Sequence, residues 1–293
     1  MSTSGPFSPR RPFSCVSPPR TASPATLYFA PYAEPFFTHL SYKGMLYAAQ
    51  EHWLHATLCF ALAASFRSNG VVLCGYLLWG LVAQPFLDRK PLRITYAAFL
   101  SACVVAPFVL HNYRAYSLFC RPTTPTIPEW CHRTPPSIYT HAQATYWNVG
   151  FLRYWSPAQI PNFALAAPPL ALLTVFAARH VLTAFLPRVL ARLALAPPPP
   201  LRETKDPFAA PSLAPYMIHT LFMCTTLLFF SHTQIVLRLA AALPTLYWGA
   251  AWLLLRDTKL DTTRWHWGKI WVAWSALWGT LSLGLWAAFL PPA

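Results

Sequence analysis

Residues Tyr146–Trp155 read Y-W-N-V-G-F-L-R-Y-W, and the apolar segment Ile160–Val181 follows directly after a short polar link. Half of the first stretch is aromatic, which is typical of chain at a membrane–water boundary, where Trp and Tyr bury a ring and keep a polar edge wet. The second segment is long enough to cross a membrane, because a span needs about 20 mostly apolar residues. Together they indicate a membrane protein with a polar boundary beside one of its spans.

The composition of the whole chain supports this interpretation. The 293 residues are 55% hydrophobic and 10% charged, whereas a soluble domain carries about 25% charged residues. Further apolar segments lie at 53–66, 71–87, 94–111, 216–231, 239–255 and 270–290. We predict an all-α polytopic membrane protein with about six to eight transmembrane segments. Its helical domain would span 27–290 and follow a disordered tail, rich in Pro, Ser and Arg, at 1–26.

The basic residues indicate how the chain is oriented. The formal net charge is +14, but the Lys and Arg residues form no single stripe, so nucleic acid is not an expected partner. Most of them lie in or beside three alternate loops, 88–93, 182–212 and 256–269. Positive residues collect on the cytosolic side of membrane proteins. We therefore expect these loops to be cytosolic, and the loop at 112–159 to be lumenal.

One short polar turn interrupts the apolar pattern. Arg67–Gly70 reads R-S-N-G between the apolar segments 53–66 and 71–87. We predict a helix that is broken or capped at this turn. The break would place Arg67 at the membrane boundary or in a cavity.

Arginines, amides and aromatic rings gather on the expected lumenal side. Arginine binds phosphate with two parallel hydrogen bonds, amides bind hydroxyl groups, and rings stack on sugar faces. This combination predicts a site for a lipid-linked anionic sugar, although interfacial anchors and helix caps remain an alternative reading of the same residues. The candidate substrate-binding residues are Arg67, Asn69, Tyr146, Trp147, Asn148, Arg153, Tyr154, Gln234 and Arg238.

Few carboxylates are available for acid–base chemistry. Of the eight acidic residues, only Glu34 and Glu129 fall on the expected lumenal side. Glu34 is the best remaining acid because its sequence neighbours are apolar; the alternative is that it only pairs with Lys43 or His39. The catalytic residue is otherwise unknown.

The sequence contains no motif for a metal or a nucleotide. Neither H-E-x-x-H nor a paired C-x-x-C spacing occurs, and there is no phosphate-binding glycine loop, so no metal site is expected. Cys120 and Cys131 fall in one polar, proline-rich loop. If that loop lies in an oxidising lumen, a disulfide between them is expected.

Six segments, in this order, resemble the PIG-V type GPI mannosyltransferases. They are S-P-A at Ser23–Ala25 with A-P-Y-A-E at Ala30–Glu34, R-S-N-G at Arg67–Gly70, the pair Trp130-Cys131, Tyr146–Trp155, Q-I-P-N-F-A-L-A-A-P at Gln159–Pro168, and Q-I-V-L-R-L…P-T-L-Y-W at Gln234–Trp248. The resemblance implies a multi-spanning enzyme of the endoplasmic reticulum with GT-C architecture, a lumenal site and no cofactor. It further implies α-1,6 transfer of the second mannose of the GPI anchor, from dolichyl-phosphate mannose to the glucosaminyl-phosphatidylinositol precursor.

The sequence also departs from that family. The resemblance implies a catalytic aspartate in a first lumenal loop, but the matching region starts only at Ser23. We therefore expect a truncated, mispredicted or divergent member without that loop. The implied partners are the sugar donor, the GPI precursor lipid, the membrane and a small membrane subunit. The alternative function is a catalytically inactive fragment or scaffold subunit of the same pathway; a transporter is disfavoured because internal repeats are not evident.

Overall fold

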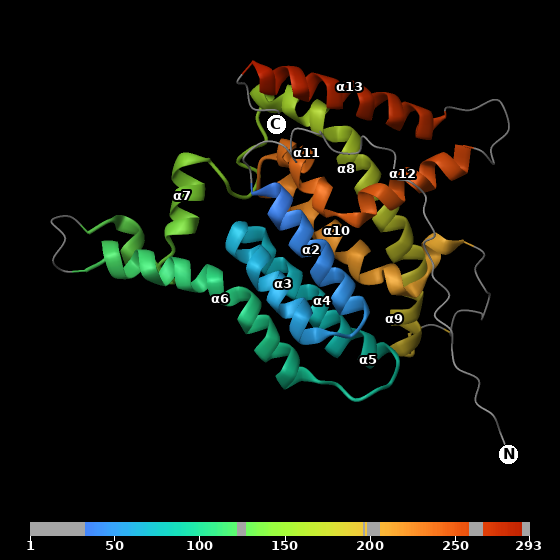
Figure 1. Ribbon diagram of the computed structural model, residues 1–293, viewed down its shortest axis with the longest axis horizontal. Helices are drawn as coiled ribbons and strands as arrows, with labels where there is room; N and C mark the ends of the chain where they lie inside the picture. The colour runs from blue at the N-terminus through green and yellow to red at the C-terminus, as the bar shows by residue number, and fades with distance from the viewer. Residues whose placement is uncertain (1–32, 122–126, 196, 198–205, 258–265, 289–293) are drawn as a thin grey trace.

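The computed structural model describes residues 33–121, 127–195, 197, 206–257 and 266–288, and every regular element among them is helical (Figure 1). The α-helices are α2 (Glu34–Ala49), α3 (Trp53–Phe66), α4 (Cys74–Leu78), α5 (Gln84–Leu87), α6 (Ile94–Phe119), α7 (Ile138–Tyr146), α8 (Ile160–His180), α9 (Leu186–Arg192), α10 (Ala214–Phe229), α11 (Val236–Leu239), α12 (Pro244–Asp257) and α13 (Trp267–Ala287). The predicted tail at 1–26 and residues 27–32 lie outside the described residues, as do parts of the loops 182–212 and 256–269.

Five helical stretches in the described part are long and apolar enough to cross a membrane. They are Ser68–Leu87, Ile94–Phe119, Pro157–Arg192, Pro211–Phe229 and Trp267–Ala287. A sixth span results if Thr233–Ala242 and Pro244–Asp257, which meet at 90°, are counted as one broken span. The all-α polytopic class is therefore confirmed, with a number of spans at or below the lower end of the predicted range.

The helix break predicted at R-S-N-G is present. Arg67 has an extended backbone (φ −146°, ψ 136°), and the 3-10 helix Ser68–Leu73 connects it to α4. Gly70 permits the close approach that follows, because a Cβ atom there would lie 2.5 Å from the Cα atom of Ala64. The backbone N–H of Gly70 also donates to the carbonyl of Arg67 (2.9 Å). The turn therefore fixes where the Arg67 side chain leaves the chain.

The first described helix packs on its neighbour through a small residue. In α2, Pro35 lies in the first turn, where its missing N–H leaves no hydrogen bond unmade. Gly44 faces the ring of Phe60 on α3 so closely that a Cβ atom would come within 2.4 Å of it. Phe60 is fully buried and belongs to the main core of the protein. This contact holds the N-terminal end of α2, which carries Glu34, near the end of α3.

Helix α6 runs farther than the sequence predicted. It continues to Phe119, so residues 112–119 of the predicted loop 112–159 are helical. Asn112 was read as the start of that loop because it is polar. Its side-chain amide, however, donates to the carbonyl of Phe108 one turn earlier (2.9 Å), which satisfies it within the helix. The loop proper begins at Cys120.

Helix α8 also continues into a segment predicted to be a loop. A π-helical turn, Val181–Phe185, joins it to α9, so the predicted loop 182–212 is helical as far as Arg192. Two basic side chains in this segment bind other parts of the protein. Arg188 pairs with Asp88 (3.3 Å), and the Nε of Arg192 donates to the carbonyl of Phe86 (2.7 Å). These bonds dock α9 on α5.

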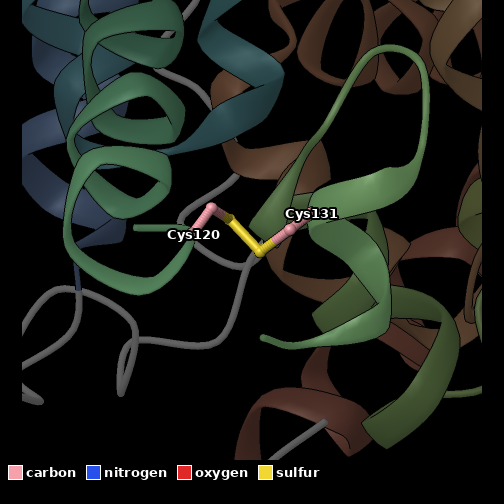
Figure 2. Close-up of a disulfide and its surroundings, with 2 residues drawn as sticks. All are labelled: Cys120 and Cys131. Carbon is pink, nitrogen blue, oxygen red and sulfur yellow. A yellow bond between two sulfur atoms is a disulfide. The ribbon is translucent and has the colours of Figure 1, made fainter. Parts of the chain in front are cut away.

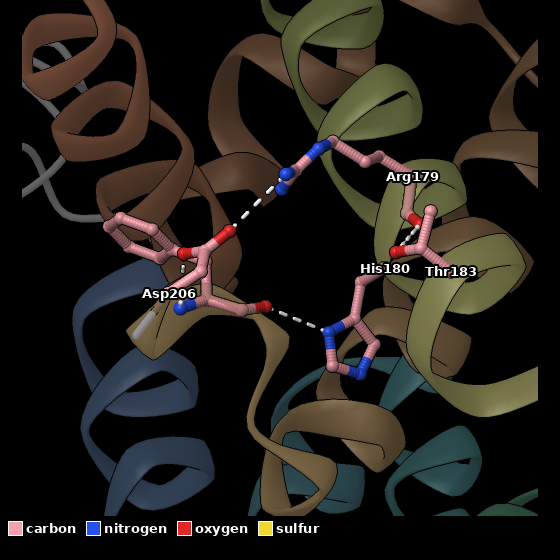
Figure 3. A network of polar contacts seen from close by, with 5 residues as sticks. Arg179, His180, Thr183 and Asp206 are labelled. Carbon is pink, nitrogen blue, oxygen red and sulfur yellow. Dashed lines mark hydrogen bonds and ion pairs between the residues drawn. The ribbon is translucent and has the colours of Figure 1, made fainter. Parts of the chain in front are cut away.

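A polar network closes the same end of the bundle (Figure 3). Arg179 pairs with Asp206 (3.2 Å), and Nδ1 of His180 bonds the carbonyl of Phe208 (2.9 Å). The three loops predicted to be cytosolic begin or end near this side, whereas α7 and the end of α6 project from the opposite side (Figure 1). The helical arrangement is thus compatible with the predicted orientation, and the assignment of the two sides stays a prediction.

The C-terminal helices are joined by buried polar contacts. The hydroxyls of Thr220 on α10 and Thr245 on α12 bond each other (2.6 Å). At the other end of α12, Oδ2 of Asp257 accepts from the backbone N–H of Gly268 (2.8 Å) and caps α13. These contacts position α12 and the preceding α11, which carries Arg238.

Candidate functional site

An ion cluster lies where three parts of the chain meet. Glu34 begins α2, Arg67 lies at the helix break, and Arg238 lies on α11. Arg67 forms an ion pair with Oε1 of Glu34, and the Nε of Arg238 lies 3.9 Å from the same oxygen. The Glu34 side chain is only 7% exposed. One buried carboxylate therefore faces two arginines, which leaves the cluster with an excess of positive charge.

Packing of α2 on the α11 region brings the distant members together. The hydroxyl of Tyr42 donates to the carbonyl of Ala241 (3.1 Å) in the 3-10 helix that follows α11. The guanidinium carbon of Arg67 lies 6.0 Å from the centre of the Phe37 ring on α2. Lys43 and His39, the alternative partners of Glu34, are both exposed. The ion cluster thus depends on tertiary contacts rather than on neighbours along α2.

A second cluster of amides and rings surrounds Tyr154. The buried Tyr154 hydroxyl donates to Oε1 of Gln234 and accepts from Nδ2 of Asn162 (2.9 Å). Asn162 also donates to Oε1 of Gln159 (2.7 Å). The ring of His232 stacks on Tyr154 with centroids 4.6 Å apart. Burial raises the pKa of Tyr154, and its hydrogen bonds with Asn162 and Gln234 oppose that shift only in part, so the hydroxyl stays protonated at neutral pH.

The two clusters are joined through one short helical segment. Gln234 and Arg238 lie four positions apart on the continuous segment Thr233–Leu239. Residues at this spacing lie on the same face of a helix. The amide–aromatic cluster and the ion cluster are therefore two parts of one candidate site.

The rest of the aromatic stretch divides into inward and outward residues. Asn148 and Leu152 have left-handed backbones (φ 50° and 56°), which reverse the chain on either side of Gly150. Leu152 N–H donates to the carbonyl of Phe229 (2.7 Å), and Nε1 of Trp155 donates to the carbonyl of Leu228 (2.7 Å). The stretch is thus anchored on the end of α10, with Tyr154 turned inward.

Several predicted site residues lie away from both clusters. Tyr146 is 76% exposed and Trp147 is 60% exposed, although the carbonyl of Trp147 bonds Nε2 of His232 (2.6 Å). Arg153 is exposed with its side chain against Gly150, and Asn69 is half-buried in the 3-10 helix. Within the described ranges, neither of these two side chains makes a hydrogen bond or ion pair. Their assignment to substrate stays a prediction.

The structure forms the disulfide between Cys120 and Cys131 (Figure 2). The sequence had left this bond open, conditional on an oxidising lumen. It closes the end of α6 on the 3-10 helix Glu129–His132, in which Trp130 is buried. Among the described residues, no group of three or more His, Cys, Asp or Glu side chains is placed to hold a metal ion.

Sequence reasoning missed some residues that border the ion cluster. Ser68 bonds the hydroxyl of Tyr139 on α7 (2.8 Å), and Asn112 accepts from the hydroxyl of Ser137 (2.8 Å). These contacts place α7 beside the helix break. A signal was present in the Ser137 N-cap, whose side chain accepts from the N–H of Thr140, but the prolines around it indicated only a loop.

Helices of membrane-spanning length define a polytopic membrane protein, and the two clusters give it a polar candidate site. The chain belongs to the family described as Mannosyltransferase (PIG-V), whose profile matches residues 21–293. The resemblance seen in six sequence segments is therefore confirmed.

Individual relatives carry related names. GPI mannosyltransferase 2 of Cryptococcus neoformans var. neoformans serotype D is 33% identical over an alignment of 299 positions. The alignment covers 94% of this chain and 66% of that protein. GPI alpha-1,6-mannosyltransferase 2 is 33% identical in Mus musculus and 31% identical in Homo sapiens, in each case over 79% of this chain and 54% of the relative. The chain thus spans between about half and two thirds of the length of these relatives. No solved structure matches the chain.

Proposed function

We propose that this chain acts as an α-1,6-mannosyltransferase of GPI-anchor synthesis in the endoplasmic-reticulum membrane. It would transfer the second mannose from dolichyl-phosphate mannose to the mannosyl-glucosaminyl-phosphatidylinositol precursor, on the lumenal side. The names of the fungal and mammalian relatives support the reaction class and the linkage. The observation that carries the proposal is the buried Glu34 carboxylate shared by Arg67 and Arg238.

The geometry suits the charges that such a transfer creates. When the bond between mannose and phosphate breaks, negative charge develops on the phosphate. Arginines next to that phosphate stabilise it by charge-assisted hydrogen bonds. Arg67 and Arg238 can take this role because both lie on the same carboxylate, that of Glu34. Glu34 holds Arg67 in position, and its carboxylate is the best candidate of this chain for the general base that accepts the proton of the acceptor hydroxyl.

The second cluster suits the sugar. Gln234 and Asn162 present amides, and the Tyr154 hydroxyl lies between them. Amides can donate and accept at once, so they can bind the hydroxyl groups of a sugar. The exposed rings of Tyr146 and Trp147 would then offer faces for stacking at the rim.

Genetic rescue tests the proposal. The 293-residue chain is expressed in cells that lack the endogenous enzyme, and surface GPI-anchored proteins are counted by flow cytometry. Microsomes from the same cells are assayed for mannose transfer from labelled dolichyl-phosphate mannose. We expect the chain to restore both readouts, and Arg67→Ala and Arg238→Ala to abolish them.

Arg133→Ala is the matched control, because Arg133 is an exposed arginine whose ion-pair partner among the described residues is the exposed Glu129. This variant should behave like the unsubstituted chain. If the chain accumulates in the membrane and transfers no mannose, the proposed activity fails and the inactive scaffold takes its place. If Arg238→Ala rescues fully, the role of Arg238 at the phosphate is excluded.

A further inference from the structure

A cavity of about 490 Å³ is lined by Arg67 but not by its ion-pair partner Glu34. The end of α3, the helix break, the middle of α6 and the start of α7 enclose it. Its polar lining comprises Ser65, Arg67, Ser68, His111, Arg114 and Tyr139. Arg67 is therefore a shared wall between this cavity and the ion cluster.

The lining is cationic. It contains two arginines and a histidine and includes no Asp or Glu. Arg67 already has Glu34 as its partner, whereas Arg114 forms no ion pair within the part of the chain that the structure describes. Arg114 is exposed at the rim, so its guanidinium can turn toward an incoming anion. A singly or doubly charged anion would compensate the lining without displacing Glu34.

The polar floor of the cavity is held in place. The hydroxyls of Ser68 and Tyr139 bond each other (2.8 Å), and the Tyr139 ring meets Phe108 edge-on at 5.2 Å between centroids. Below them Asn112 is buried, and its Oδ1 accepts from the N–H of Tyr139 (3.3 Å). Such a fixed arrangement lowers the entropy that the protein's own side chains lose when a ligand binds.

The remaining wall is apolar and open. Phe66 and Leu110 line the cavity and are 45% and 63% exposed. Leu110 lies on α6, which is itself of membrane-spanning length and composition. A ligand that fits would therefore have an anionic head for Arg114 and a hydrocarbon part that leaves past Leu110 into the lipid.

We propose that this cavity binds the phosphate of a membrane lipid, with Arg114 as its principal cation. Resting on the proposed function, the phosphate belongs to one of the two lipid substrates, since both the dolichyl donor and the phosphatidylinositol acceptor carry one. A phosphate held here lies beside Arg67, which also pairs with Glu34. Binding would in this way align the lipid with the ion cluster.

Lipid binding to the purified full chain, measured by native mass spectrometry from phosphatidylcholine nanodiscs, tests the proposal. The probes are dolichyl phosphate, glucosaminyl-phosphatidylinositol and uncharged dolichol. We expect Arg114→Gln to weaken the binding of one or both phosphate lipids by about tenfold or more. This is the effect expected when a hydrogen bond to a charged group is lost. Dolichol binding should not change, and the lipid that is lost identifies which substrate occupies the cavity.

Two further variants make the result decisive. Arg114→Lys keeps the charge and should bind within about threefold of the unsubstituted chain, because a lysine binds phosphate as a point charge. Arg133→Gln removes an exposed arginine elsewhere on the same side and should have no effect. The proposal is overturned if Arg114→Gln binds both phosphate lipids as tightly as the unsubstituted chain does. It is also overturned if Arg133→Gln weakens their binding as much as Arg114→Gln does.

A second variant, with a negative charge introduced at the mouth of the cavity, tests the proposal even if Arg114→Gln does not fold. Leu110→Glu changes an exposed side chain and should weaken phosphate lipids but not dolichol; unchanged binding of phosphate lipids by this variant again overturns the proposal. Because binding is measured without transfer, an inactive chain that still shows the Arg114 dependence contradicts the proposed mannosyltransferase activity and leaves the phosphate site standing.

Discussion

Tyr154 and Gln234, 80 positions apart in the sequence, share a hydrogen bond in which the tyrosine hydroxyl donates to the amide oxygen. The bond joins the aromatic stretch that precedes α8 to the segment that carries Arg238. Both partners are side chains that the sequence predicted for the site. The candidate site therefore depends on it.

Removing this hydroxyl should weaken both the fold and the transfer reaction. In Tyr154→Phe, Gln234 and Asn162 lose a shared partner in a buried position. Loss of a hydrogen bond in a partly buried position costs about 0.5–1.5 kcal/mol. We expect a lower thermal midpoint in detergent by scanning fluorimetry and reduced mannose transfer.

Tyr146→Phe is the control for this change. Tyr146 belongs to the same stretch but is 76% exposed. Its hydroxyl should be dispensable for stability. Equal midpoints for Tyr154→Phe and the unsubstituted chain would show that the buried hydrogen bond contributes nothing.

The Glu34–Arg67 ion pair should show strong coupling in a double-mutant cycle. Glu34→Gln alone leaves Arg67 and Arg238 facing each other without a carboxylate, and breaking a buried pair in this way costs about 3–5 kcal/mol. Arg67→Gln alone leaves the buried Glu34 carboxylate with Arg238, at 3.9 Å, as its remaining arginine neighbour. The double variant should be far less destabilised than the sum of the two, with a coupling of about 1–3 kcal/mol.

The exposed pair Glu129–Arg133 provides the comparison cycle. Its side chains are 84% and 50% exposed, so water screens the interaction. Coupling there should stay below about 1 kcal/mol. Similar coupling in the two cycles, from thermal midpoints or denaturant titration, would contradict the assignment of Glu34 and Arg67 as a buried pair.

The sequence was sufficient to predict the class of fold and the break at Arg67. Long apolar segments indicate spans whatever their neighbours do, and R-S-N-G interrupts the pattern locally. The partner of Glu34 was not predictable in the same way. Lys43 and His39 lie on the same helix, but the residue that pairs with Glu34 comes from a position 33 residues away. That contact depends on how α2 packs on α3, which one sequence does not show.

The inward orientation of Tyr154 was hidden for a related reason. In a regular helix or strand, periodicity indicates which residues face inward. Here left-handed residues at Asn148 and Leu152 reverse the chain within a few positions. The five aromatic residues in this stretch of ten therefore show no helical or strand periodicity. Tyr154 is distinguished from its exposed neighbours by its burial and its hydrogen bonds, which the sequence does not show.

The Cys120–Cys131 bond gives a test of the predicted orientation. If the loop lies in the oxidising lumen, intact microsomes treated with maleimide-polyethylene glycol after denaturation should gain two labelled thiols when a reductant is added first. Cys59, Cys74, Cys103 and Cys224 are free and should label in both cases. Full labelling without reductant would place the loop in a reducing compartment or disprove the bond.

Loss of the same disulfide should loosen the end of α6. It closes a loop with a sequence separation of 11 residues, and a loop of that size stabilises by about 3 kcal/mol in the chain-entropy account. The double variant Cys120→Ser with Cys131→Ser should therefore be cleaved faster between α6 and α7 in limited proteolysis. An unchanged cleavage rate would mean that the buried Trp130 alone holds this segment.

Gly70→Ala should disrupt the site without altering any side chain that belongs to it. The new Cβ atom would meet the backbone of Ala64 at 2.5 Å, and a backbone neighbour cannot turn away as a flexible side chain can. Overpacking of this kind costs about 1–3 kcal/mol. Because Gly70 N–H also bonds the Arg67 carbonyl, the strain should shift Arg67 away from Glu34.

We therefore expect both a lower thermal midpoint and a loss of transfer for Gly70→Ala. Gly279→Ala is the matched control, since nothing lies within 4 Å of its Cβ position on α13. Alanine is favoured over glycine by about 1 kcal/mol inside a helix, so this variant should be as stable as the unsubstituted chain or slightly more so. If Gly70→Ala keeps full transfer although it is destabilised, the position of Arg67 does not limit the reaction, and the ion cluster serves only the fold.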